Sequence, residues 1–173
     1  LTSGQDIDLH PRYEFYCANS WRDYGDDDKA LKWYLKRTQS SGWSEEKYMA
    51  YLNAALILER RGDFEKSTYL LLCGHDLIPE RAECLYHATR ILRGQEKFNT
   101  AHLLSKKLIE IKVPKGNRLF LRHLIYEYWS AYEYLYLMGR AGEDPRGADI
   151  YHEFMSSKIP DSYKKSIESL CKT

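Results

Sequence analysis

The sequence predicts an all-α chain in which antiparallel pairs of helices stack as a right-handed solenoid. Three observations predict this class. Apolar residues recur at helical spacing along the chain, and Gly-centred or polar turns separate these runs. The small residues Ala30, Ser67 and Ala101 follow each other at intervals of 37 and 34 residues (30 to 67, 67 to 101). A period near ~34 residues is typical of paired-helix repeats, in which small residues let two helices cross closely.

Three clear repeats are predicted before residue 115. In each, an apolar helix leads into a turn and a second amphipathic helix begins next to an aromatic residue, such as Phe64 or Phe98. The interval between the first two small residues is longer because of extra residues in the loop 39–43. The predicted helical pairs span Arg12–Gln39, Glu45–Asp76 and Ala82–Ile111, within repeats of about 11–43, 44–78 and 79–114.

A divergent fourth repeat, at about 119–160, is predicted to follow. Its first helix is expected over Leu119–Met138, its turn over Gly139–Pro145 and its second helix over Arg146–Met155. A last helix, capped by Asp161 and lying within 161–171, would cover the end of the stack. We expect one domain over residues 11–173. Residues 1–10 are expected to be a linker from a preceding domain, because the chain opens at Leu1 on a polar segment.

Composition and charge exclude several classes of function. The chain is 43% hydrophobic and 29% charged, which permits a continuous core. Lys and Arg total 26 against 25 Asp and Glu, so no basic field favours nucleic acid or an anionic membrane. No apolar run approaches the ~20 residues of a membrane span. We expect a cytoplasmic location, with free thiols at Cys17, Cys73, Cys84 and Cys171.

The acidic clusters and the histidines indicate no enzyme active site. Asp26–Asp28 opens a helix, so its carboxylates are expected to cap backbone N–H groups. Asp6 and Asp8 lie in the expected linker, where a metal-binding role is the alternative. No histidine belongs to a zinc or nucleophile motif. We therefore expect no catalytic residue, no metal and no cofactor in this segment.

The sequence resembles the tetratricopeptide family and, more narrowly, the region that follows the catalytic domain in some bacterial and viral family 2 glycosyltransferases. The narrower resemblance rests on PRYEFYCANSWRDYGDDDKALKWYLKR at Pro11–Arg37, Gly42-Trp43, Pro79–Glu83 with Leu85-Tyr86, and Ile125–Trp129. It covers most of residues 10–139. It implies that nucleotide-sugar chemistry belongs to an upstream domain and that this chain is a non-catalytic, accessory part of a transferase.

In such solenoids the first helix of each repeat lines a concave groove. Peptide-binding tetratricopeptide domains grip a C-terminal carboxylate with asparagines and cations. Asn19 and Asn53 match those asparagines, but Phe15, Glu83 and His87 stand where cations are needed. The asparagines can bond an extended peptide or simply join two helices. The predicted groove residues are Arg12, Phe15, Asn19, Arg22, Leu52, Asn53, Leu56, Glu59, Tyr86, His87, Arg90 and Arg93.

Tyrosine is frequent, with 15 in the chain, and several crowd the segment 126–136, which we expect to meet the catalytic domain or a second copy. The leading hypothesis is a scaffold that holds a preceding catalytic domain, a glycan or peptide acceptor, or a protein partner. Its oligomeric state is left open. The alternative is a stand-alone adaptor that binds a peptide in its groove. A third hypothesis is a glycan-binding module that uses Tyr86 and Phe15.

Overall fold

The computed structural model describes residues 11–116 and 118–171, and within these it contains helices and no strand. The expected linker 1–10, with Asp6 and Asp8, lies outside the described residues. The contacts divide the chain into two compact units, with the boundary between Ile78 and Pro79. This boundary coincides with the predicted end of the second repeat. Each unit therefore holds two of the predicted repeats.

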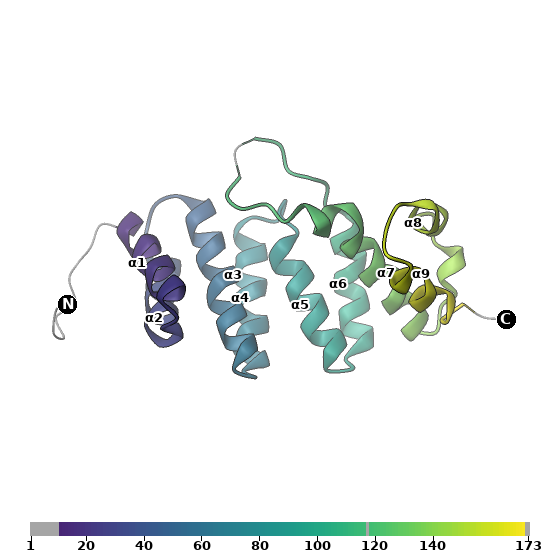
Figure 1. Ribbon diagram of the computed structural model, residues 1–173, viewed down its shortest axis with the longest axis horizontal. Helices are drawn as coiled ribbons and strands as arrows, with labels where there is room; N and C mark the ends of the chain where they lie inside the picture. The colour runs from purple at the N-terminus through teal and green to yellow at the C-terminus, as the bar shows by residue number, and fades with distance from the viewer. Residues whose placement is uncertain (1–10, 117, 172–173) are drawn as a thin grey trace. The chain divides into compact units, whose positions relative to one another are not determined.

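Unit 1 consists of two helical hairpins in which each helix packs on the next (Figure 1). Asp26 and Asp63 cap the second helix of each hairpin by accepting hydrogen bonds from the backbone N–H groups of Lys29 and Lys66. The capping role expected of Asp26 is thus confirmed. Its helices are α1 (Pro11–Tyr24), α2 (Asp27–Gln39), α3 (Ser44–Arg60) and α4 (Phe64–Leu77).

Unit 2 begins with a third hairpin and continues into shorter elements. α5 packs on α6, α6 on α7, and the last helix, α9, also packs on α7. At Gly139 of α7 a Cβ would lie 2.7 Å from the Cβ of Leu170, so glycine permits this close approach. The elements are α5 (Glu83–Gly94), α6 (Phe98–Glu110), the π-helix η1 (Ile125–Trp129), α7 (Ser130–Arg140), the 3₁₀ turn η2 (Pro145–Gly147), α8 (Tyr151–Ser156) and α9 (Asp161–Glu168).

One turn geometry ends the first helix of all four predicted repeats. A residue with positive φ donates its N–H to the carbonyl three residues back, and the next residue donates to the carbonyl five residues before itself. This is the hydrogen-bond pattern that closes many helix C-termini. It therefore supports the phase of the repeats, including the divergent one. The positive-φ residues are Gly25, Gly62, Glu96 and Gly142.

Glu96 is the exception among these turns, because a side chain in the left-handed region costs roughly 1–2 kcal/mol. We expect Glu96→Gly to raise the free energy of unfolding by about 1 kcal/mol, since Glu96 is exposed. Urea denaturation followed by circular dichroism measures the change. Gln95→Gly is the matched control, because Gln95 has a φ of −89° and gains nothing from glycine. Equal effects of the two substitutions would contradict the strain at Glu96.

The fourth repeat departs from its predicted boundaries. The first helix was expected from Leu119, but Phe120 has a φ of +52° and the N–H of Arg122 donates to the Glu83 carboxylate rather than to a helix carbonyl. The second helix, expected over Arg146–Met155, is interrupted, because Ala148 is extended and only Tyr151–Ser156 is α-helical. Asp161 is the first residue of α9 and makes no side-chain cap, so the predicted cap is wrong.

The crowded tyrosines of segment 126–136 are half-buried and pack within unit 2. Tyr128 and Tyr132 meet Tyr163 of α9 edge to face, and Tyr134 stacks on His102 of α6. The contact expected with another domain stays a prediction. Among the described helices, none combines the length and the apolar character that crossing a membrane requires.

Candidate functional site

Four of the predicted groove residues meet at Tyr34, a fully buried residue of α2. Its hydroxyl donates to Asn19 Oδ1 at 2.6 Å, accepts from Arg22 Nη1 at 3.2 Å, and forms a hydrogen bond with Asn53. Phe15 is buried against the ring, with centroids 6.2 Å apart. Burial raises the pKa of Tyr34 to about 12, although Arg22 and Asn53 act in the opposite direction.

This cluster joins α1, α2 and α3 through side chains. Of the two roles left open for the asparagines, the structure displays the inter-helix hydrogen bond, with Tyr34 as the shared partner. Phe15 presents no free ring face to a sugar, because it is buried. Arg22 is the exposed member, and it also pairs with Asp23 at 2.8 Å. The cluster thus sets the register of the first three helices.

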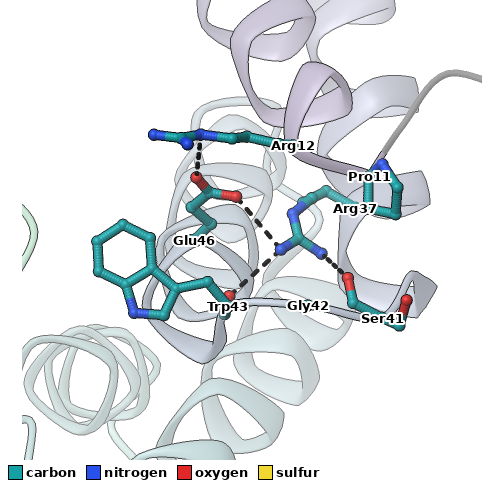
Figure 2. A pocket seen from close by; sticks show the side chains of 7 residues that line it. All are labelled: Pro11, Arg12, Arg37, Ser41, Gly42, Trp43 and Glu46. Atoms are coloured by element: carbon teal, nitrogen blue, oxygen red, sulfur yellow. Dashed lines mark hydrogen bonds and ion pairs between the residues drawn. The ribbon is translucent and has the colours of Figure 1, made fainter.

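An open cleft of about 690 Å³ lies elsewhere in unit 1, beside the loop between α2 and α3 (Figure 2). Arg12 is the predicted groove residue that lines it. The buried guanidinium of Arg37 holds the loop together, donating to the carbonyls of Ser41 at 3.0 Å and Trp43 at 3.3 Å. The cleft is lined by Pro11, Arg12, Arg37, Ser41, Gly42, Trp43 and Glu46.

The buried carboxylate of Glu46 is shared between two arginines. Oε2 accepts from Arg37 Nη2 at 3.3 Å, and Oε1 lies 3.7 Å from Nε of Arg12. Figure 2 shows Arg12 on one side of this carboxylate and the Trp43 ring on the other. Nε of Arg37 has no hydrogen-bond partner within the described residues. Two cations and one anion thus meet an exposed indole, which suits a ligand with a flat apolar group and a hydrogen-bond acceptor.

The predicted groove residues of unit 2 lie on α5, where Tyr86 and His87 are buried and the two arginines are half-buried. Tyr86 stacks on Trp129 with centroids 5.6 Å apart, so this ring face is also occupied. His87 lies 3.3 Å from Nη2 of Arg90 and 3.3 Å from Nη1 of Arg122. Burial and these two positive charges lower the pKa of His87 to about 3. His87 is therefore neutral at physiological pH.

A buried ion pair at the start of α5 is hydrogen-bonded to η1 through Tyr126. Glu83 and Arg81 are both fully buried, with Arg81 Nη2 at 3.0 Å from Glu83 Oε1. The Tyr126 hydroxyl donates to Glu83 Oε2 at 3.0 Å and accepts from the N–H of Ala82 at 3.0 Å. Burial acts to raise the pKa of Glu83, but the hydrogen bond and charge of Arg81 outweigh it and hold the pKa below its ordinary value.

Sequence reasoning missed Arg37, Glu46 and Glu133 because charged residues were assigned to the surface. Glu133 accepts from Nε and Nη2 of Arg93 at 2.7 and 3.0 Å. A signal was present, since Arg37 stands three residues after the buried Tyr34, on the same helix face. A charged residue on a buried stripe indicates an internal ion pair.

The acidic turn of unit 1 makes ion pairs as well as a cap. Asp27 and Asp28 pair with Arg60 and Arg61, each at 2.8 Å. Within residues 11–116 and 118–171, no three His, Cys, Asp or Glu side chains gather as metal ligands. No protein-family model and no curated protein matches this chain. The resemblance to glycosyltransferase accessory regions therefore stays a prediction.

Proposed function

We propose that the chain is a non-catalytic scaffold of tetratricopeptide-like repeats stacked as a right-handed solenoid. In this proposal it is the accessory C-terminal part of a cytoplasmic glycosyltransferase acting on nucleotide-sugar donors. It needs no cofactor of its own and contacts protein rather than nucleic acid or membrane. The recurrence of one turn geometry at four repeats supports the repeat assignment. The sequence resemblance supports the link to a transferase.

The main observation that supports a role in protein interaction is a group of exposed aromatic side chains on α1. Tyr13, Tyr16 and Tyr24 are 60%, 47% and 80% exposed. At 3.6 residues per turn, intervals of three and eleven residues place all three on one side of the helix. Exposed tyrosines provide large, rigid contact area and are enriched at the centres of protein interfaces. We name Tyr13, Tyr16 and Tyr24 the α1 face.

The α1 face is linked to the cleft through Arg12, which donates to the Tyr16 hydroxyl at 3.2 Å and lies 3.7 Å from Glu46. A partner seated on the tyrosines therefore lies within reach of Arg12 and, beyond it, of Trp43. We propose that the preceding catalytic domain binds here. In the alternative, a stand-alone adaptor, the same surface receives a separate protein.

The first test is to read the protein sequence upstream of Leu1 and to express any domain found there apart from residues 11–173. We expect a nucleotide-binding α/β domain that transfers sugar and that binds the helical chain in isothermal titration calorimetry. When the helical chain carries Tyr13→Ser, Tyr16→Ser and Tyr24→Ser together, the affinity should fall at least tenfold. Each lost tyrosine contact of about 1–2 kcal/mol justifies this magnitude.

The matched control is Phe64→Ser, Tyr69→Ser and Leu72→Ser on α4, where exposed side chains of similar size are removed. This control should leave the affinity unchanged. An upstream sequence without a sugar-transferring domain would remove the transferase part of the proposal and favour the adaptor. Equal losses for the two triple variants would contradict the α1 face as the contact surface.

A further inference from the structure

Unit 2 contains a small, largely enclosed pocket between α6, η1, α7 and α8, separate from the α1 face and its cleft. Its volume of about 190 Å³ has room for roughly six waters at about 30 Å³ each. Half-buried isoleucines and Ala131 form much of its wall, while charged side chains stand at its edge. The pocket is lined by Ile109, Ile111, Lys112, Val113, Tyr126, Glu127, Ser130, Ala131, Ile150 and Glu153.

A π-helical turn shapes one wall of this pocket. The N–H of Ser130 donates to the carbonyl of Ile125, five residues back, in place of the usual four. Such wide turns are rare and occur frequently at functional sites. In a regular helix a serine hydroxyl commonly bonds a carbonyl three or four residues back. The π-turn therefore changes what Ser130 Oγ can reach.

Ser130 is 5% exposed, and its hydroxyl oxygen has no hydrogen-bond partner among the described residues. Leaving a buried hydroxyl without a partner costs free energy, and such groups in native proteins usually have a bound molecule or another explanation. Because Ser130 lines the pocket, a ligand inside it can supply the missing donor.

The charged residues at the pocket indicate which kind of hydrogen-bond donor a ligand would bring to Ser130. Glu127 and Glu153 are exposed and come from η1 and α8. Among the described residues that line the pocket, Lys112 is the only cation against two carboxylates, so this set carries a net negative charge. A positively charged head group is therefore favoured over a carboxylate or phosphate. The apolar wall favours an aliphatic stem attached to that head group.

We propose that this pocket binds a primary alkylammonium group, as carried by a lysine side chain of a partner polypeptide or by a free diamine. An ammonium has three donors, which match one hydroxyl and two carboxylates on different elements. Its methylene stem packs against Ile109, Ile111 and Ile150. A guanidinium presents a planar fork suited to a bidentate carboxylate, and it matches three separate acceptors less well. This proposal does not depend on a transferase parent.

The test is a titration of isotope-labelled protein with Nα-acetyl-lysine methylamide, monitored by NMR amide shifts. We expect shifts that centre on 109–113, 126–131 and 150–153. The norleucine analogue, which lacks the ammonium, and the Nε-acetylated derivative should bind at least tenfold more weakly. A titration with 1,5-diaminopentane identifies the source: tighter binding of the lysine derivative assigns the site to a polypeptide, and tighter binding of the diamine assigns it to a small amine.

Two variants separate binding from folding. Ser130→Ala should weaken binding several-fold yet leave the melting temperature unchanged or raised, because it removes a hydroxyl without a partner. Glu127→Gln with Glu153→Gln should weaken binding at least tenfold. The control, Glu65→Gln with Glu168→Gln, changes the net charge equally at exposed sites outside the pocket. Equal binding of the norleucine analogue, equal effects of the two double variants, or shifts outside these segments would overturn the proposal.

Discussion

Glu83→Ala is expected to lower the free energy of unfolding by about 3–5 kcal/mol, because it breaks the buried ion pair between the Glu83 carboxylate and the Arg81 guanidinium. The same substitution removes the acceptor for the Tyr126 hydroxyl and for the N–H of Arg122. These lost bonds place the cost toward the upper end of that range. Urea denaturation followed by far-ultraviolet circular dichroism measures it.

The exposed ion pair of Asp27 with Arg60 provides the control. Arg60 Nη2 donates to both carboxylate oxygens at 2.9 and 2.8 Å, but both side chains reach solvent. Asp27→Ala should therefore cost less than about 1 kcal/mol. Similar losses for Glu83→Ala and Asp27→Ala would mean that the Arg81–Glu83 pair is not desolvated in solution.

An intermediate variant separates charge from hydrogen bonding. Tyr126→Phe keeps the ion pair and removes one donor to Glu83 and one acceptor for the N–H of Ala82. Its expected cost, about 1–3 kcal/mol, lies below that of Glu83→Ala. The loop that carries Arg122 depends on the same carboxylate, so Glu83 determines both the start of α5 and the path of the chain into η1.

The helical pairs were predictable from sequence because glycine stands at the same phase in three of the four turns within them. Gly25 and Gly62 adopt the left-handed conformation that closes a helix, and the aspartates after them cap the next helix. The third turn could not be predicted in this way, because Glu96, rather than a glycine, adopts the left-handed conformation there. There the geometry follows from the packing of α5 on α6 rather than from local preference.

The fourth repeat was mispredicted where a tertiary contact replaces a local one. The segment before Ile125 reads as helix, yet the bond between Glu83 and the N–H of Arg122 holds it in another path. The spacing of apolar residues does not predict the π-turn that follows, because the same residues fit an α-helix equally well. The pocket lined by Ser130 was for that reason invisible in the sequence.

The candidate groove stays a prediction. The two asparagines and Phe15 share a partner in Tyr34, which the repeat pattern treated as packing alone. The cleft needs Arg37, whose buried guanidinium donates hydrogen bonds to backbone carbonyls. Hydrophobic periodicity does not predict the burial of such a charged side chain. A buried polar group needs hydrogen-bond partners, and these come from segments that the sequence pattern does not bring together.

The pH dependence of stability should report His87. In the unfolded chain its pKa is near 6.5, whereas burial, Arg90 and Arg122 lower it to about 3 in the folded chain. Between pH 6.5 and about pH 3, His87 is protonated in the unfolded state but stays neutral in the folded state. Stability is therefore full above pH 6.5 and falls by about 2–3 kcal/mol on going to pH 4.5.

His87→Gln should reduce this slope strongly, because glutamine does not titrate, and His102, whose pKa burial and Lys106 lower, accounts for a remaining part. His152→Gln, at an exposed position of α8, should leave the wild-type slope intact. The comparison uses the change of unfolding free energy between pH 6.5 and 4.5 for each protein, so a constant cost of either substitution cancels. Glu83 contributes below its unfolded pKa of about 4.5 and lies outside this window. An unchanged slope after His87→Gln would mean that His87 takes up its proton in the folded state, and hence that it is less buried, or further from Arg90 and Arg122, in solution than it is here.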